Sequence, residues 1–476
     1  MKNVFLIILY FLLIFEGNAQ GSSSSHSDYD YSSYSSISFN QNLDNDNLES
    51  SSSKQSVVYV TSPLITISNS NLRKTGNTAD EDLKDSKFYG VNAVVLVNGG
   101  EVKITGGVIT NKAKGVSSIC ATNSGIVKIS GTTISSIDAG SARGLHATYN
   151  GTIIASNIHI SISGGSSATL STDRGEGTVS CTQCKLYPTG SGSPIIYSAG
   201  TTSTITVSGT FGRAFEAQCV AVEGKNTAIV QDNSHLVCYG YGYIGDIDKC
   251  GIFIYQSMSG NAGVGTATFK CIDSTLAISS SSTIYDSAPM FVITNTSAEI
   301  NLENCTLNYG SKIFLNATTN SVGWGTSGSN EGNVNLTLTN QNIEGDFVID
   351  SGSSLTINMI NSSITGKINT ENVSTNIDVI LDSDSSITLT GDSYISSLTD
   401  ADTTRSNINN QSYILVIINK NEDTTVSSTS SSSTSNNPTN IISNDDNALY
   451  STLGSAIAIT AVISTLLLPL LFCIWV

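Results

Sequence analysis

Basic residues are scarce in this sequence. Its 476 residues include 21 Lys and Arg against 38 Asp and Glu, which gives a formal net charge of −17. No basic stripe runs along the chain, so the sequence argues against a nucleic-acid partner. An acidic surface keeps a protein soluble and attracts cations, and it repels polyanions unless calcium bridges the two.

An amphipathic 3.6-residue period is nearly absent, which argues against helices. Residues 93–225 instead repeat one phrase about every 25 residues: a few β-prone residues, a small polar residue or Glu, then Gly within two positions. The turn positions of the repeat are Asn98, Asn123, Asn150, Asp173, Ser198 and Glu223, with steps of 25, 27, 23, 25 and 25 residues. A fixed period of this size, carried by strands and glycine turns, predicts a coiled β-solenoid.

Short segments rich in Val, Ile and Thr continue to about Lys420, with apolar residues alternating with polar ones. Alternation of this kind places apolar side chains inside and polar side chains outside. We therefore predict an all-β chain whose residues 57–420 form a parallel β-helix of about fourteen rungs, on the order of 70 Å long. A β-sandwich or barrel array also has alternating strands, and the regular step favours the solenoid.

Both ends of the chain differ from the repeats. Residues 1–19 have a positive Lys2, a short apolar run and a small-residue motif that ends at Ala19, which predicts a secretory signal peptide. The alternative is an uncleaved anchor. Residues 20–56 are rich in Ser, Asp and Tyr, so we expect a flexible, disordered arm.

The C-terminal end predicts a stalk and an anchor. Residues 421–447 are rich in Ser, Thr and Asn and are typical of a stalk. Residues 448–476 are largely apolar, and no Lys or Arg follows the apolar run. This pattern favours a GPI signal with attachment at Asn444 over a transmembrane helix. Either anchor places the chain on the extracellular face of the plasma membrane, with the lipid membrane as a partner.

The chain has nine cysteines, and eight remain if the segment that holds Cys473 is removed. An even number in a secreted chain predicts disulfides. Cys238 and Cys250 flank a Tyr-rich loop, and we expect a disulfide to close it. Cys181 and Cys184 form the only CxxC, so structural thiols are favoured there over zinc or redox chemistry.

N-glycosylation sequons are frequent, as expected for the surface of a secreted eukaryotic chain. They begin at Asn150, Asn295, Asn304, Asn316, Asn335, Asn361, Asn372 and Asn410.

The phrases NGGEVKITGGVIT, RGLHATYNGT and VEGKNTAIV, with related rungs up to about Lys420, resemble secreted right-handed parallel β-helix proteins of pectin-lyase-like shape. The likeness extends to adhesin-like and autotransporter-passenger-like chains. It implies a right-handed β-helix solenoid and a surface or adhesive module, and it supplies no catalytic set.

Catalytic motifs are missing from the sequence. Pectin-active hydrolases of this shape pair Asp residues with a Gly-His-Gly step, and this chain has no such step. The nearest candidates are Arg143, Asp173, Arg174 and Glu176, which could gather on one edge of the rod and polarise a uronate. The alternative is an exposed ion pair that closes a turn. The four histidines show no metal-binding spacing, and satisfied or surface histidines are the simpler interpretation.

Aromatic side chains are the candidates for glycan binding. Tyr239, Tyr241 and Tyr243 lie in the Cys-bounded loop, and Trp324 lies in a Gly-rich segment. Flat rings on loops can stack on sugars, or they can seal the loop instead. Asp246 and Asp248 share the Tyr-rich loop and allow a calcium site, but too few oxygen ligands are visible to predict a metal.

Three functions fit these features. The favoured one is an anchored, adhesive or structural β-helix on the cell surface, with extracellular glycans or cell-surface proteins as partners and no cofactor. A carbohydrate-active enzyme, such as a polyuronate lyase or glycoside hydrolase on the same rod, is the alternative. A polysaccharide-binding module without catalysis is the third.

Overall fold

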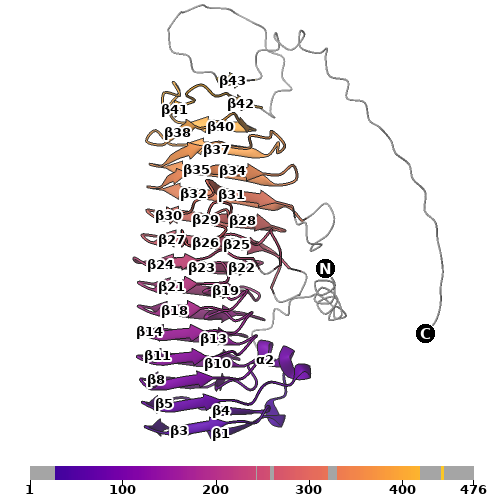
Figure 1. Cartoon of the computed structure of the whole chain (residues 1–476), viewed down its shortest axis with the longest axis vertical. Coiled ribbons are helices and arrows are strands. Elements are labelled where there is room, and N and C mark those ends of the chain that lie inside the picture. The colour runs from indigo at the N-terminus through magenta and orange to yellow at the C-terminus, as the bar shows by residue number, and fades with distance from the viewer. Residues whose placement is uncertain (1–26, 243, 258–261, 320–329, 419–440, 444–476) are drawn as a thin grey trace, which may run out of the picture.

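The computed structural model describes residues 27–242, 244–257, 262–319, 330–418 and 441–443. Within these ranges every strand pairing is parallel, and each strand pairs with the equivalent strand one turn of the coil away. The chain is therefore a parallel β-helix, as predicted. Figure 1 shows its rungs stacked along one axis from the indigo N-terminal end to the yellow C-terminal end.

Three long sheets run along the rod. The first, sheet A, contains β1 (Ser35–Phe39), β4 (Gln55–Val60), β7 (Val95–Asn98), β10 (Ser117–Thr122), β13 (Arg143–Ala147), β16 (Leu170–Thr172), β19 (Ile196–Ser198), β22 (Val220–Glu223), β25 (Ile252–Tyr255), β28 (Phe291–Thr294), β31 (Ile313–Thr318) and β34 (Asp346–Ile349).

The second, sheet B, contains β2 (Leu43–Asp44), β5 (Ile65–Ser68), β8 (Glu101–Thr105), β11 (Ile126–Ser130), β14 (Gly151–Ser156), β17 (Gly177–Thr182), β20 (Thr204–Ser208), β23 (Thr227–Gln231), β26 (Thr266–Ile272), β29 (Thr296–Glu303), β32 (Gly332–Thr339), β35 (Ser354–Ile360), β37 (Ile377–Leu381) and β40 (Ser397–Asp400).

The third, sheet C, contains β3 (Asn47–Ser50), β6 (Asn71–Lys74), β9 (Val108–Asn111), β12 (Thr133–Ser136), β15 (His159–Ile162), β18 (Lys185–Pro188), β21 (Phe211–Ala214), β24 (His235–Cys238), β27 (Thr275–Ile278) and β30 (Thr306–Asn308).

Two smaller sheets complete the C-terminal end. Sheet D contains β33 (Asn342–Glu344), β36 (Ser363–Gly366), β38 (Ser386–Leu389) and β41 (Ile408–Asn409), and sheet E contains β39 (Ser393–Ile395), β42 (Leu415–Ile417) and β43 (Ile441–Ser443). The helical elements are short: η1 (Tyr31–Ser33), η2 (Asp80–Asp82) and α2 (Leu83–Tyr89). Within the described ranges, no helix has the length and apolar character that a membrane crossing requires.

The core consists of apolar columns that run along the inside of the coil. In sheet A, Leu145 pairs with Leu170, and Leu170 pairs with Ile196 on the next rung. All three are fully buried. Each such side chain contributes about 1.5–3 kcal/mol of hydrophobic stabilisation. Because like residues stack on like, one sequence phrase per rung is enough to build the whole interior.

The predicted turn positions lie at or just after the ends of sheet A strands, so the repeat seen in the sequence is one rung of the coil. Asn123 has a left-handed backbone, with φ of 51°. Its side-chain nitrogen donates to Asn98 Oδ1 on the preceding rung at 2.7 Å. Asparagine tolerates this conformation because its short polar side chain hydrogen-bonds locally.

The expectation of a flexible arm over residues 20–56 is wrong for its later part. Strands β1, β2 and β3 form a first rung, and β4 begins at Gln55. Ser38 and Leu43 are buried in this rung. The segment has few large apolar residues, yet it needs few, because the next rung supplies the strand partners and most of the apolar surface. Its composition alone therefore understated its order.

Several predictions about the ends lie outside the described residues. These are the signal peptide over 1–19, the attachment residue Asn444 and the apolar segment 448–476. Of the stalk predicted over 421–447, the structure describes only β43, which pairs with β42 in sheet E.

Candidate functional site

Arg143 begins β13 of sheet A, and Asp173, Arg174 and Glu176 lie in the turn between β16 and β17. The helix α2 lies beside the N-terminal part of sheet A (Figure 1). Arg143 is buried, and its Nη1 donates to the carbonyl oxygens of Ala142 at 3.1 Å and Ser166 at 2.7 Å. Asp173 is only 1% exposed. Burial raises the pKa of this carboxyl to about 7, although the positive charges of Arg143 and Arg174 oppose the shift. The structure thus brings Arg143 and Asp173 into electrostatic contact.

The other two catalytic candidates point elsewhere. The Arg174 guanidinium lies 4.2 Å from the centre of the Phe88 ring of α2. Glu176 is exposed and accepts a hydrogen bond from Thr202 Oγ1 at 3.2 Å. The four candidates therefore do not form one exposed constellation. The alternative of an exposed ion pair at this turn is also wrong, because Asp173 is buried.

His146 lies in the same region and is fully buried. Its Nδ1 is 2.8 Å from Ser171 Oγ, and its Nε2 is 2.7 Å from the carbonyl oxygen of Lys87. Burial, with the nearby Arg143 charge, lowers the pKa of the imidazole to about 3. A neutral ring with both nitrogens engaged is a structural histidine that ties α2 to the sheet, as the sequence interpretation held.

A second buried carboxylate lies two rungs further on. Glu223, used in the sequence only as a turn position, accepts hydrogen bonds from the hydroxyl of Tyr197 at 2.5 Å and that of Tyr255 at 3.3 Å. The hydroxyl of Ser257 donates to its other oxygen. Both carboxylate oxygens are therefore engaged, and this group serves to tie successive rungs together on the outside of sheet A.

Two aromatic side chains of the predicted loop, Tyr239 and Tyr241, contact other residues of the same chain. The Tyr239 ring stacks on Phe215 with centroids 5.7 Å apart, and the guanidinium of Arg213 lies 5.7 Å from the centre of the Tyr239 ring. The hydroxyl of Tyr241 is 3.0 Å from Thr283 Oγ1. These contacts support the alternative in which the rings seal the loop. The other two candidates, Tyr243 and Trp324, lie outside the described residues.

The two loop aspartates make protein contacts of their own. Asp246 forms an ion pair with Lys249, and the oxygens of Asp248 accept from the backbone nitrogens of Ile244 and Gly245, each at 3.1 Å. Asp248 thus closes the loop as an acceptor. No group of three or more metal-ligating side chains was found in the described part of the chain.

The predicted disulfide between Cys238 and Cys250 is wrong. Both are free and buried, and the disulfide joins Cys181 to Cys184. The reason is that the two side chains belong to different clusters. Cys238 lies in the interior of the coil, whereas Cys250 packs with Phe253 and Val292 on the outer side of sheet A. Adjacency at the ends of a loop did not bring their sulfurs together.

The sequon asparagines differ in accessibility. Most are exposed or partly exposed, namely Asn150, Asn295, Asn304, Asn316, Asn335, Asn361 and Asn372. Asn410 is buried, and its Nδ2 has no hydrogen-bond partner among the described residues. A glycan on Asn410 conflicts with that burial, because the modified nitrogen is enclosed by protein.

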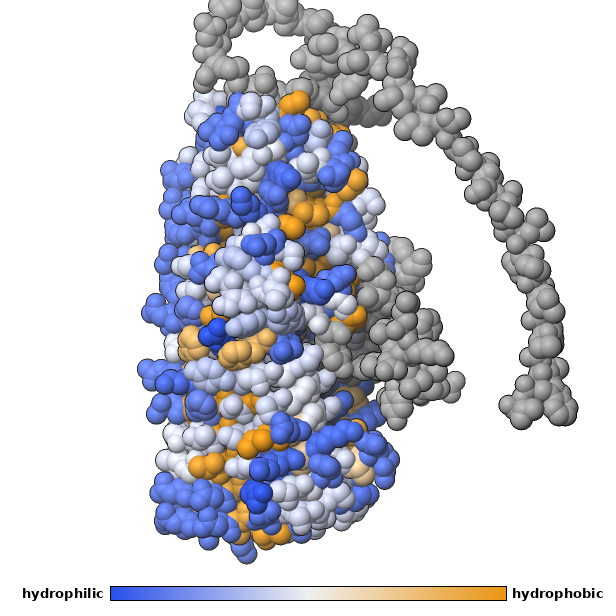
Figure 2. Space-filling view, viewed as in Figure 1, coloured by the Kyte–Doolittle hydropathy of each residue, from blue (hydrophilic) through white to orange (hydrophobic). Residues whose placement is uncertain are grey.

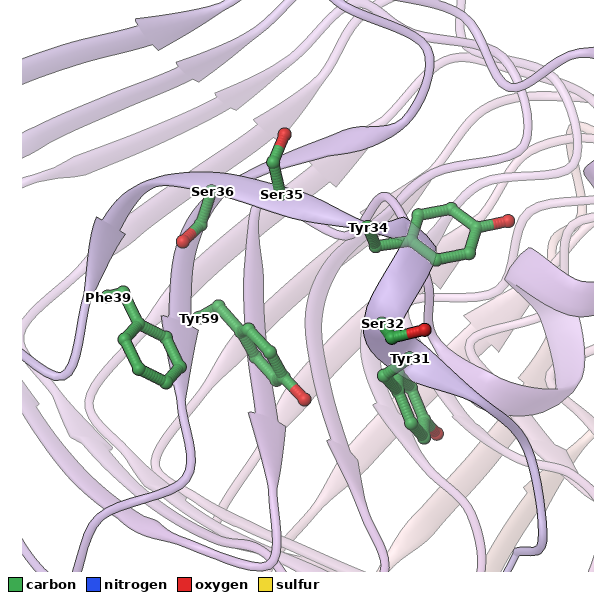
Figure 3. Close-up of a pocket in the computed structure, with 7 residues that line it drawn as sticks. All are labelled: Tyr31, Ser32, Tyr34, Ser35, Ser36, Phe39 and Tyr59. Atoms are coloured by element: carbon green, nitrogen blue, oxygen red, sulfur yellow. The ribbon is translucent and has the colours of Figure 1, made fainter.

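The sequence interpretation missed an aromatic depression at the N-terminal end of sheet A. Its volume is about 480 Å³, and it is lined by Tyr31, Ser32, Tyr34, Ser35, Ser36, Phe39 and Tyr59. Figure 3 shows Phe39, Tyr59 and Tyr31 side by side, with their rings projecting in the same direction. The Phe39 ring is 5.5 Å and the Tyr31 ring 6.4 Å from that of Tyr59. Phe39 is 52% exposed.

Hydrogen bonds hold two of these rings in place. The hydroxyl of Tyr59 accepts from Asn98 Nδ2 at 2.9 Å, and that of Tyr31 donates to the carbonyl oxygen of Tyr89 at 3.0 Å. The nearby tyrosines Tyr31 and Tyr34, within the segment predicted to be a flexible arm, are the sequence signal for this site. The Ser, Asp and Tyr content of the segment favours a flexible arm instead, so composition alone misses this site.

A second aromatic row, which we call the sheet C row, was also missed. His159, Tyr187, Phe211 and His235 follow one another over four rungs, with ring centroids 5.2, 5.9 and 5.6 Å apart. Phe211 is 37% exposed, and both histidines are exposed. Figure 2 shows that the face in that view is mostly hydrophilic, with apolar residues in short patches between. Aromatic clusters on such a polar rod stand out as binding candidates.

Comparison with family models, with curated proteins and with solved structures finds no significant match to this chain.

Proposed function

We propose that this chain is a membrane-anchored, extracellular β-helix protein that binds polysaccharide at the cell surface and acts in adhesion. The observation that carries the proposal is the aromatic depression of Tyr31, Tyr34, Phe39 and Tyr59. Its rings are fixed by neighbouring strands, and serine hydroxyls line the same hollow. Apolar ring faces with a few polar groups beside them are typical of sites that bind sugars through stacking.

The signals at the two ends support the location. A signal peptide over 1–19, a stalk, sequons and an apolar C-terminal segment are the combination expected of an anchored surface glycoprotein. The rod-like β-helix agrees with the resemblance to pectin-lyase-like, adhesin-like surface chains. On this proposal the stalk holds the rod away from the membrane, and the N-terminal end of the coil presents the depression.

Binding to insoluble polysaccharides tests the site. The full chain is incubated with a panel of insoluble glycans, and the bound fraction is measured. If each ring contributes about 0.5–1.5 kcal/mol, Phe39→Ala with Tyr59→Ala should weaken binding roughly tenfold. Ile154→Ala is the matched control, because Ile154 is an exposed apolar residue of sheet B away from the depression. Unchanged binding by the double variant would remove the depression from the argument.

The anchor has a separate test. Phosphatidylinositol-specific phospholipase should release the protein from intact cells, and Asn444→Gln should reduce its surface display if Asn444 carries the lipid. Full retention after the enzyme treatment would favour a spanning helix instead.

A second candidate function is a polyuronate lyase or glycoside hydrolase. The observation that favours it is Asp173, whose pKa of about 7 would let the carboxyl hold a proton near neutrality beside Arg143. A general acid needs this property. Incubation with polyuronate and calcium, followed by ultraviolet absorbance of unsaturated product, tests the lyase, and reducing-end release tests the hydrolase. Activity that disappears in a folded Asp173→Asn variant would favour the enzyme over the binding protein.

A further inference from the structure

Two cysteines on neighbouring rungs lie with their sulfurs close together. Cys271 is on β26, and Cys305 lies between β29 and β30. Both are free thiols in the structure, as Cys238 and Cys250 are, but their Sγ atoms are only 2.7 Å apart, and both residues belong to the buried interior. An S–S bond is about 2.05 Å long, so the two sulfurs need to approach by less than an ångström.

Their positions match those of the Cys181–Cys184 disulfide. Along sheet B, Cys181 pairs with Val207, Val207 with Val230, and Val230 with Cys271, so Cys181 and Cys271 share one inward column. At the adjoining turn before sheet C, the equivalent column contains Cys184, Thr210, Ser234, Ser274 and Cys305. The disulfide at Cys181 shows that side chains of the two columns meet within bonding reach.

Neither Cys271 nor Cys305 has a cysteine partner in its own rung. In the rung of Cys271, the column at the turn before sheet C contains Ser274. In the rung of Cys305, the inward column of sheet B contains Leu302. Each sulfur therefore meets its counterpart across the step between β26 and β29. Cys305 is also fixed by its backbone, because its nitrogen donates to Gln341 Oε1 at 2.7 Å.

We propose that Cys271 and Cys305 form a disulfide that joins two successive rungs. In this step two thiols lose two protons and two electrons, and one S–S bond forms. The electrons and protons pass to a disulfide oxidant by thiol–disulfide exchange, which releases that oxidant as two thiols. The link closes the chain between the two rungs at the inside corner of sheets B and C. It does not depend on glycan binding.

The test uses the purified full chain, first reduced and then treated with oxidised glutathione in its folded state. Remaining thiols are blocked in urea, glycans are removed, and the chain is cleaved after Lys and Glu. Peptides 271–299 and 304–312 should be recovered as one linked species, two hydrogens lighter than their sum, that separates on reduction. Recovery of both cysteines as blocked thiols would overturn the proposal.

A matched variant supplies a second readout. Cys271→Val with Cys305→Ser replaces each cysteine with a residue that its own column carries elsewhere, Val230 and Ser234. Both proteins keep the Cys181–Cys184 bond, so reduction should lower the urea midpoint of the wild type more than that of the double variant. Equal shifts in the two proteins would contradict a link between the rungs.

Discussion

The rod has two parts that differ in the length of their rungs. In the N-terminal part, Leu145, Leu170 and Ile196 are register partners separated by 25 and 26 residues. In the C-terminal part, Leu336, Ile357 and Val379 are separated by 21 and 22 residues. Sheet C ends at β30, and the smaller sheet D follows from β33. The shortening follows from turns that carry fewer residues.

The two parts also bury different side chains. Within the described residues, the buried charged residues and histidine are Lys74, Arg143, His146, Asp173, Glu223 and Asp248, all of them before β25. The later interior is apolar, with residues such as Leu336, Ile357 and Val379. The longer rungs leave room for turns, for α2 and for polar side chains outside the sheets. The shorter rungs repeat little more than the core itself.

A column of phenylalanines, whose rings meet edge to face or tilted, connects the two parts. Phe269, Phe291, Phe314 and Phe347 lie in the interior, with successive ring centroids 5.6, 5.3 and 5.2 Å apart. They come, in that order, from β26, β28, β31 and β34. Their large rings fill the interior where the rung length changes.

The largest effect is expected at this junction. Phe314→Ala should lower the free energy of unfolding by about 3–5 kcal/mol, because it removes a fully buried ring and leaves a cavity. Urea unfolding followed by circular dichroism measures the change. Phe211→Ala is the control, since that ring is partly exposed, and it should cost less than about 1 kcal/mol. Similar losses in both variants would show that the junction has no special role.

The next effect depends on pH and tests the buried groups of the N-terminal part. His146 has a folded-state pKa of about 3, below the ordinary value of 6.5. Between these values the unfolded chain binds a proton that the folded chain excludes, so stability falls as pH falls. The loss is roughly 1.4 kcal/mol per pH unit. Comparing the urea midpoints of the wild type and His146→Gln between pH 6.5 and 4.5 should show a steeper decline in the wild type.

Protonation of Asp173 changes the stability of the folded chain in the opposite direction. Its folded-state pKa is raised from 3.8 to about 7, so the folded chain binds the proton first and this group adds stability as pH falls through that range. The urea midpoint of Asp173→Asn should therefore fall more steeply with decreasing pH than that of the wild type. The urea midpoint of His146→Gln should fall less steeply. Identical pH profiles for the two variants would contradict these assignments.

A smaller effect is expected at Glu223. Tyr197→Phe removes one hydrogen bond to this buried carboxylate, and a bond to a charged group is worth about 1.5–3 kcal/mol. The other hydroxyls that reach Glu223 will limit the loss to the lower end of that range. Tyr187→Phe is a matched control on the partly exposed sheet C row. A loss no larger than that of the control would show that Glu223 does not depend on this hydroxyl.

The smallest effect concerns the cross-rung contacts on the outside of the rod. In the N-terminal part Lys128 Nζ pairs with Glu101 at 2.8 Å, and in the C-terminal part Asn358 Nδ2 donates to Asn335 Oδ1 at 3.0 Å. Lys128→Ala should cost about 0–1 kcal/mol and lose its effect in high salt. Asn358→Ala should cost a similar amount that salt leaves unchanged. An equal salt dependence would remove this distinction between the two parts.

The sequence by itself determined the parallel β-helix and the length of its rungs. Each rung is one copy of a local phrase, and alternation with asparagine or glycine turns sets the side-chain directions within a few residues. It also favoured a place for Asp173 near Arg143, since about one rung of sequence separates them, although Arg143 begins β13 and Asp173 follows the end of β16.

The tertiary structure alone decided which columns meet, and this is where the sequence interpretation failed. Cys250 turns outward while Cys238 turns inward, residues 35–50 form a rung because a neighbouring rung completes it, and Tyr31 reaches Tyr59 through that same rung. Contacts of this kind depend on the distance that the chain spans in each turn between two strands. That distance is set by packing between rungs and not by any short stretch of sequence.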